Sequence, residues 1–140
     1  IGWIDPEYKK FTGVDMGAAT TEENEALAKE LEFERVPDFE YTVTGEYRVP
    51  MADRGDLIFR GQYAWREGFY TDTINRPLRA IDDYGILDAS VRFENENWRV
   101  SLWGRNLTEE NYADIISVGF NYQRFGGQAR TYGVEVGYRF

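Results

Sequence analysis

The last ten residues, TYGVEVGYRF (131–140), alternate without interruption between two kinds of side chain. One parity holds Tyr132, Val134, Val136, Tyr138 and Phe140, and the other holds polar residues and glycine. A period of two is that of a β-strand with one apolar and one polar face. Such a strand either covers a soluble core or belongs to a membrane barrel with its apolar face on lipid.

The same alternation predicts strands over 38–49, 56–66, 83–94 and 98–106. A sixth and less regular strand is predicted over GWIDPEYKKF (2–11), which Pro6 interrupts. Ile58 is an exception, since it shares the parity of the charged residues. The apolar positions of the four regular strands are Phe39, Tyr41, Val43, Gly45, Tyr47 and Val49; Leu57, Phe59, Gly61, Tyr63 and Trp65; Leu87, Ala89, Val91 and Phe93; Trp98, Val100 and Leu102.

The connections between these strands are alternately long and short. Residues 12–37, 67–83 and 107–129 are long, whereas 50–55 and 95–97 are short. The whole net charge of −9 lies in the three long connections, and the remaining residues balance. An antiparallel meander with every second connection long has its elaboration at one end, which is typical of an outer-membrane barrel.

Composition excludes several classes of function. The chain of 140 residues has no cysteine and no histidine, so thiolate metal sites, histidine–metal centres and histidine bases are absent. The net charge of −9 argues against nucleic acid as a partner. The acid pairs Glu22–Glu23, Asp82–Asp83 and Glu109–Glu110 are either solvated loop carboxylates or ligands for a divalent cation. We predict no catalytic, metal or cofactor residues.

The first long connection contains one helical pattern. In TTEENEALAKELEFE (20–34), Ala26, Leu27, Glu30 and Leu31 recur at helical spacing. We expect a short loop helix with Thr21 as its N-cap, for which Asn24 is a poor third partner. After the fifth strand, Asn106 is expected to bond the loop backbone, because its NLT context is an unlikely glycosylation site in a barrel.

The tail resembles the C-terminus of a TonB-dependent outer-membrane receptor. The stretches that carry the resemblance are YGILDASVRFENENW (84–98), WRVSLWGRNLTEENY (98–112) with its Asn-Leu and acidic-aromatic turn, and RTYGVEVGYRF (130–140). IGWIDPEYKKF (1–11) is a weaker match. The resemblance implies an all-β fold in which residues 1–140 are an antiparallel meander of about six strands, the C-terminal fragment of a transmembrane barrel of about 22 strands.

The resemblance also implies a location and partners. It implies a protein of the bacterial outer membrane that takes up a scarce solute, such as a ferric siderophore, and is not an enzyme. The plug, the TonB-contacting segment and the signal peptide of this family precede the barrel, so we expect this chain to lack them. The implied partners are membrane lipid and lipopolysaccharide, the plug and the rest of the barrel, TonB through the missing N-terminal part, and the outer-membrane assembly machinery.

Two groups of residues become candidate sites. The terminal strand resembles the signal read by the assembly machinery, with Val134, Val136, Tyr138 and Phe140 filling pockets during strand addition; alternatively, Phe140 is only the last lipid-facing residue. Aromatic and arginine side chains in the outer loops either grip a ligand or pack the loops together. The candidates for ligand contact are Phe69, Tyr70, Arg76, Arg79, Phe120, Tyr122 and Arg124.

The inward charges have two possible roles. They either line a transport path, or they pair across strands and touch the plug. These charges include Glu46, Arg60, Arg92, Arg99 and Glu135. Two other proteins remain open from the residues alone: a passive porin-type barrel fragment, and a small soluble β-barrel that binds a ligand. In the soluble protein the apolar faces would form a core.

Overall fold

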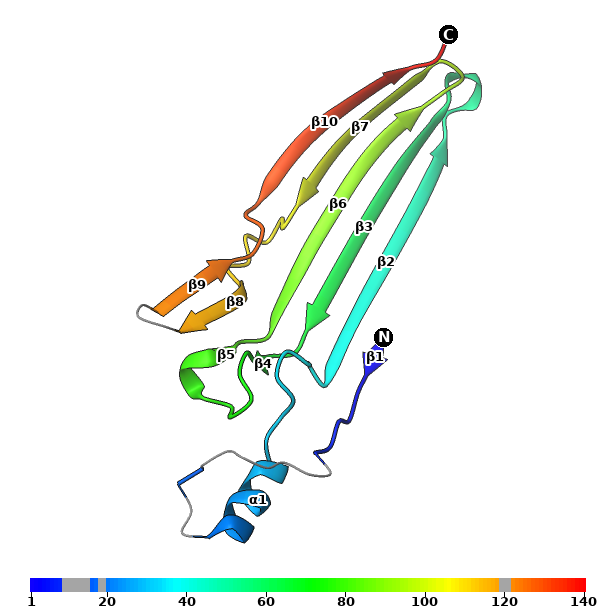
Figure 1. The fold of residues 1–140 in the computed structure, drawn as a ribbon. Helices are drawn as coiled ribbons and strands as arrows, with labels where there is room; N and C mark the ends of the chain where they lie inside the picture. The colour runs from blue at the N-terminus through cyan, green and yellow to red at the C-terminus, as the bar shows by residue number, and fades with distance from the viewer. Residues whose placement is uncertain (9–15, 18–19, 119–121) are drawn as a thin grey trace. The chain divides into compact units, whose positions relative to one another are not determined.

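A computed structural model of the chain describes residues 1–8, 16–17, 20–118 and 122–140. The long strands run side by side in Figure 1. The elements in chain order are β1 (Gly2–Trp3), α1 (Thr21–Lys29), β2 (Phe39–Pro50), the 3₁₀ turn η1 (Ala52–Arg54), β3 (Asp56–Arg66), β4 (Phe69–Tyr70), the 3₁₀ turn η2 (Pro77–Arg79), β5 (Ala80–Ile81), β6 (Tyr84–Glu94), β7 (Trp98–Arg105), β8 (Ala113–Val118), β9 (Tyr122–Gly126) and β10 (Thr131–Tyr138).

Six strands form one sheet in the order β1-β2-β3-β6-β7-β10. Both neighbours of β7 run antiparallel to it, and Val100 lies opposite Phe93 on one side and Val136 on the other. The next row contains Arg92, Ser101 and Glu135. Because the predicted parities match across these strands, the all-β meander expected from the sequence is confirmed. No helix of the described residues is long and apolar enough to cross a membrane.

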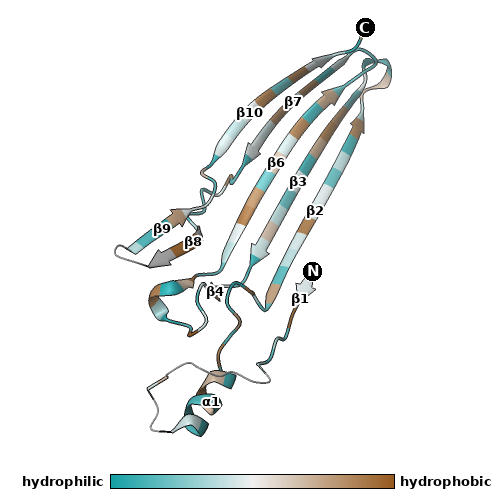
Figure 2. Cartoon of the chain, in the orientation of Figure 1, coloured by the Kyte–Doolittle hydropathy of each residue, from teal (hydrophilic) through white to brown (hydrophobic). Residues whose placement is uncertain are grey.

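The chain divides into two compact units, which we describe separately. The loop unit comprises Ile1–Glu40, Arg66–Asp83 and Tyr112–Gly126, and the sheet unit comprises Tyr41–Trp65, Tyr84–Asn111 and Gly127–Phe140. The sheet unit contains all of β6, β7 and β10, the larger part of β2 and β3, and both short turns. Along these strands hydrophobic and hydrophilic residues alternate in Figure 2.

The sheet unit has an apolar face and a polar face. On the apolar face the Tyr63 ring lies over Gly85, and Tyr41 stacks on Trp65 with ring centroids 5.7 Å apart. On the polar face Thr44 Oγ1 donates a hydrogen bond of 3.4 Å to Gln62 Oε1. These contacts show that β2 and β3 place alternate residues on the same two faces as β6, β7 and β10, for which the strand register fixes the faces.

The loop unit has a small hydrophobic core of its own. Phe69, Ile81, Ala113 and Ile116 are buried, and β8 packs against β5 and η2. Two short hairpins supply this core, since β4 pairs with β5 and β8 pairs with β9. Alternation did not reveal these hairpins, because their strands are too short or too irregular to show a period.

Two sequence expectations are corrected. The predicted strand over 2–11 extends only over Gly2–Trp3, residues 4–8 are not in a strand, and residues 9–11 lie outside the described part. The helix is present, but its N-cap is Thr20 rather than Thr21. Thr20 Oγ1 accepts from the Glu23 backbone N–H while the Glu23 carboxylate accepts from Thr20 N, which makes a complete capping box.

Candidate functional site

The apolar face of the sheet unit is uncovered. Leu102 is 58% exposed and its register partner Val134 is 65% exposed. Full burial of one such side chain is worth about 1.5–3 kcal/mol, so the exposed set represents on the order of 20 kcal/mol of unused burial. A contiguous patch of this size marks a surface that contacts lipid or protein. The exposed members are Val43, Tyr47, Phe59, Tyr63, Trp98, Val100, Leu102, Tyr132, Val134, Val136, Tyr138 and Phe140.

Aromatic rings gather at one end of this face. The Trp98 and Tyr138 centroids lie 4.8 Å apart, and Tyr138 and Phe140 lie 5.1 Å apart at nearly perpendicular planes. Val134, Val136, Tyr138 and Phe140, the predicted assembly signal, are all exposed on the apolar side. Their role in assembly stays a prediction.

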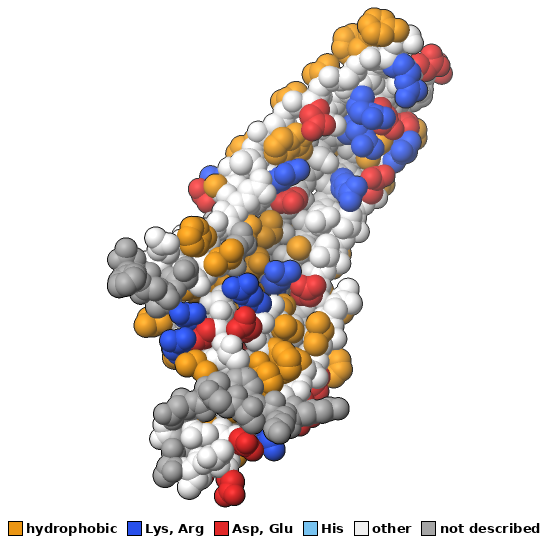
Figure 3. Space-filling model, in the orientation of Figure 1, with side chains coloured by type: hydrophobic (Ala, Val, Ile, Leu, Met, Phe, Trp, Pro, Cys, Tyr) orange, Lys and Arg blue, Asp and Glu red, His pale blue; other side chains and the backbone are white. Residues whose placement is uncertain are grey.

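The polar face carries a network of ion pairs centred on Glu94, which we call the Glu94 cluster. The Glu94 carboxylate lies 3.2 Å from Arg92, 3.7 Å from Arg99 and 3.8 Å from Arg48. Arg48 also bonds Asp56 at 2.8 Å. Figure 3 shows basic and acidic side chains intermixed on the visible face of these strands. The predicted pairing of inward charges across strands is therefore present here for Arg99, which lies on β7, whereas Arg92 and Glu94 both lie on β6.

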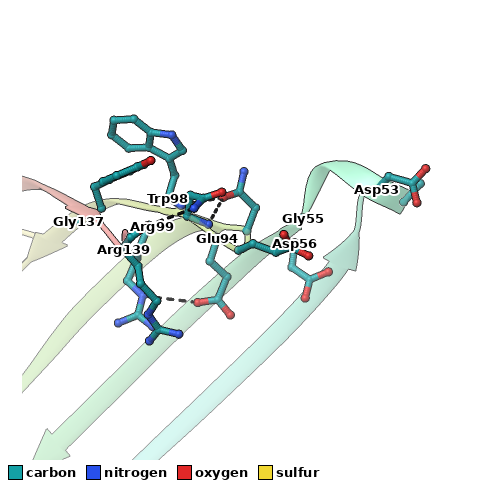
Figure 4. A pocket seen from close by; sticks show the side chains of 13 residues that line it. Asp53, Gly55, Asp56, Glu94, Trp98, Arg99, Gly137 and Arg139 are labelled. Atoms are coloured by element: carbon teal, nitrogen blue, oxygen red, sulfur yellow. Dashed lines mark hydrogen bonds and ion pairs between the residues drawn. The ribbon is translucent and has the colours of Figure 1, made fainter.

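An open hollow of about 840 Å³ lies beside this cluster, between the two short turns and the end of β10. Figure 4 shows Arg99, Arg139 and Glu94 on one side of the strands, with the Trp98 indole on the other. Gly55 closes the turn with φ of 115°, and a Cβ there would overlap the Glu94 carbonyl oxygen. The Asn97 side chain donates to the Arg139 carbonyl at 3.1 Å, which ties the turn to the last strand.

A second, smaller hollow lies further along the polar face, and we call it the Trp103 hollow. Trp103 shares the polar parity, and its indole occupies the space that a side chain at Gly133 would fill. The Arg105 guanidinium carbon lies 5.2 Å from the centroid of the Trp103 ring. Sequence reasoning placed Trp103 on the polar face but gave it no role. The sequence signal for this arrangement is the pair Gly133 and Gly137 on β10, because glycines on the polar face leave room for large side chains of the neighbouring strand β7.

Asn106 organises the end of β7, as the sequence predicts. It is 2% exposed, has φ of 49°, and its Nδ2 donates to the carbonyls of Glu110 at 2.9 Å and Gln128 at 2.8 Å. Its Oδ1 accepts from Glu110 N at 2.8 Å, while Asp88 accepts from Asn106 N at 2.9 Å. Asn fits this position because it tolerates positive φ and bonds the loop backbone.

A buried aspartate shapes the loop 67–83. Asp72 is 5% exposed, and its carboxylate accepts from Arg76 Nε at 2.6 Å and Arg76 N at 3.1 Å. Asn75 clamps the loop to the segment before β2, since its amide accepts from Glu32 N at 2.7 Å and donates to Glu32 O at 3.0 Å. The sequence analysis missed Asp72, although the Asp72-to-Arg76 spacing was a usable signal.

The predicted ligand-contact residues have different surroundings. Phe69 is buried in the core of the loop unit, Arg76 is held by Asp72, and Tyr122 is 51% exposed. Tyr70 and Arg79 are half-buried, Arg124 is exposed, and Phe120 lies outside the described residues. A ligand role for these residues stays a prediction.

Electrostatics and metal chemistry add little to the loop unit. Burial, together with the carboxylates of Asp38 and Glu67, raises the pKa of Glu32 above its ordinary value. Within the described part of the chain, acidic side chains do not gather in threes where a metal ion could be held.

Comparison with known proteins identifies the fold. No family model matches the chain. The ferric yersiniabactin uptake receptor FyuA from Yersinia pestis is similar at 20% identity and a TM-score of 0.68, over 76% of this chain and 17% of that one. BauA, the ferric preacinetobactin receptor from Acinetobacter baumannii, is similar at 19% identity and a TM-score of 0.57, over 79% of this chain and 16% of that one.

This chain therefore spans less than a fifth of the length of either receptor. At such identities the likeness shows the fold: an antiparallel meander that matches part of an outer-membrane receptor barrel. The fold class predicted from the sequence is confirmed at that level.

Proposed function

We propose that this chain is the C-terminal barrel segment of a TonB-dependent outer-membrane receptor that imports a scarce solute. The observation that carries the proposal is the uncovered apolar face behind a charged polar face. In a bilayer the apolar face lies against lipid, and every strand edge is paired within a closed barrel. The polar face then lines the lumen.

A ferric siderophore is the solute class we propose. This choice is supported by the two structural relatives, which are receptors for ferric yersiniabactin and ferric preacinetobactin. The plug and the TonB-contacting segment would be supplied by sequence outside residues 1–140. The outer loops, which carry the net negative charge of the chain, would face the cell exterior.

Fractionation of native cells tests the proposal. We expect an antibody against this chain to detect a band in the outer membrane several times heavier than 16.3 kDa, with migration that differs between boiled and unboiled samples. A band near 16 kDa in the soluble fraction would replace the receptor with a small ligand-binding β-protein.

A second experiment separates a receptor from a passive porin. Deletion of the gene should abolish growth on one ferric siderophore under iron limitation, and loss of TonB should have the same effect. A porin would instead support uptake that does not depend on TonB.

A further inference from the structure

The last strand, β10, takes its register from a single neighbour among the described strands. It lies at the edge of the six-stranded sheet, where its partner is β7. A short turn fixes the register of β6 against β7, but β7 and β10 are joined by the long connection 107–129, which imposes no register. A slip of one residue is rejected because it would turn every apolar side chain to the polar face. A slip of two residues keeps both faces, so other contacts must reject it.

Two aromatic–glycine pairs between β7 and β10 are in place to do so. Trp103 lies opposite Gly133, and its indole occupies the space that a side chain at Gly133 would fill. On the other face Tyr132 lies opposite Gly104, and a Cβ on Gly104 would come within 3.1 Å of the Tyr132 ring and closer still to the Leu107 side chain. Each strand therefore supplies one ring and one glycine, at adjacent positions and on opposite faces.

Packing, rather than hydrogen bonding, holds the Trp103 ring in this position. Its Nε1 is shielded from solvent and has no hydrogen-bond partner among the described residues, although buried N–H groups are nearly always satisfied. The residues opposite Trp103 on its two neighbouring strands are both small, Ser90 on β6 and Gly133 on β10. The indole therefore lies where the sheet leaves room for it, and its position depends on the register.

Either slip of two residues would separate the rings from their glycines. In one direction Trp103 would face Glu135. Arg99 would then face Arg139, which places like charges opposite each other. In the other direction Trp103 would face Thr131. Arg99 would then face Glu135, an opposite charge, so charge does not reject this second slip. Its rejection depends on the rings and the glycines that they cover.

We propose that the reciprocal pairs Trp103–Gly133 and Tyr132–Gly104, which we call the ring–glycine lock, fix the register of the C-terminal strand. A slip of two residues would move the exposed apolar end of β10 by roughly 7 Å along β7. The lock therefore determines where that end lies in the folded sheet. This inference goes beyond the proposed function, because it depends only on contacts between two strands of the sheet unit.

Disulfide trapping of the refolded protein tests the lock. The intact protein is unfolded in urea, refolded in buffer, or in vesicles if its extraction requires detergent, and then oxidised. Val100→Cys is combined with Val136→Cys to report the register described here, and with Val134→Cys or Tyr138→Cys to report the two slips. A disulfide joins residues that lie directly opposite each other and does not reach their diagonal neighbours. Mass spectrometry of the linked peptides gives the yield of each pair.

Four variants relate the register to the lock. Trp103→Ala and Tyr132→Ala should each raise the ratio of slipped to unslipped links about threefold, and the double variant about tenfold, because each removes one cross-strand pair. Trp103→Phe keeps a ring over Gly133 and should leave the ratio unchanged. Trp98→Ala is the matched control, since it removes an equal ring from the same strand, opposite Tyr138 rather than a glycine, and it should not raise the ratio.

Three results would overturn the lock. The first is an unchanged ratio in the double variant, and the second is an equal rise in Trp98→Ala and Trp103→Ala. The third is a rise in Asn97→Ala as large as in the double variant, which would assign the register to the hydrogen bond from Asn97 to the Arg139 carbonyl. If the double variant does not refold, the single variants, which each keep one pair, give the same test. The links do not depend on cellular location or uptake, so failure here is distinct from failure of the proposed function.

Discussion

The two faces of the sheet unit differ in how far the chain itself provides partners for their side chains. The polar face satisfies much of its own charge, with Glu94 contacted by three arginines and Arg48 held by Asp56. The apolar face satisfies nothing internally: Leu102, Val134 and Val136 are each more than half exposed. A sheet with these faces needs lipid or apolar protein on one side and water or polar protein on the other.

This difference shows which of the two faces indicates what the sheet contacts. Exposed ion pairs contribute little stability, about 0–1 kcal/mol each, so the polar face is compatible with many neighbours. The apolar face is not, because on the order of 20 kcal/mol of potential burial depends on what covers it. The apolar face therefore carries the case for a membrane.

The largest expected effect comes from one charge on the apolar face. In a lipid-embedded protein Leu102→Arg should destabilise by about 2–4 kcal/mol. Ser101→Arg places the same charge one residue away on the polar face, opposite Glu135, and should change stability by less than about 0.5 kcal/mol. Urea unfolding in vesicles measures both. Equal effects would remove the contrast between the faces.

A smaller loss of stability is expected from a substitution of Asn106, which follows the end of β7. Asn106→Ala removes three side-chain hydrogen bonds from a buried site and should cost about 2–3 kcal/mol. Asn97→Ala removes one exposed bond to Arg139 and should cost less than about 1 kcal/mol. Denaturant midpoints at constant m-value compare them, and similar midpoints would mean that Asn106 is not the organising residue.

Two glycines test how tightly the polar face is packed. A methyl at Gly133 would overlap the Trp103 indole, so Gly133→Ala should destabilise by about 1–3 kcal/mol and change the fluorescence of Trp103. A methyl at Gly137 meets only ordinary contacts at 3.9 Å, so Gly137→Ala is the matched control and should be neutral or slightly stabilising. If the two variants unfold alike, Trp103 does not lie where we describe it.

The smallest effect on stability is expected in the loop unit, which belongs to neither face of the sheet. The raised pKa of Glu32 means that its charged form is disfavoured in the folded state, so its charge opposes folding above that pKa. Since Glu32 is mostly exposed, Glu32→Gln should stabilise by no more than about 0.5 kcal/mol at pH 7, and the gain should vanish as the pH falls through the raised pKa. Thermal unfolding at pH 7 and pH 4 measures it. A gain that is equal at both pH values would assign it to the amide rather than to the lost charge.

The sequence predicted regular strands well and loops poorly, for a physical reason. The ends of five strands were predicted to within one or two residues. Their apolar residues alternate with polar ones, as Tyr132, Val134 and Val136 do in the last strand, and this alternation is visible in the sequence as a period of two. The loop hairpins depend on contacts such as Phe69 with its neighbours in the loop unit, which leave no period. The N-cap moved by one residue because Thr20 and Thr21 are both good caps, and only Glu23 at the third position decides between them.

The candidate sites follow the same division. The uncovered apolar face and the role of Asn106 were predictable, since each rests on a local pattern. The Trp103 hollow was not, because it depends on which residues of β3, β6, β7 and β10 come into register. No spacing within one strand reveals that Arg60 and Glu135 line the same hollow.

The central claim, that the apolar face lies against lipid, can be tested directly on β7. Residues 1–140 contain no cysteine, so each single-cysteine variant from Trp98 to Arg105 adds one labelling site to this part of the protein. We expect the accessibility of the labels in native membranes to alternate, with oxygen favoured at 98, 100 and 102 and a water-soluble nickel complex favoured at 99, 101 and 105. Nickel access at 98, 100 and 102 equal to that at 99 and 101 would contradict the account.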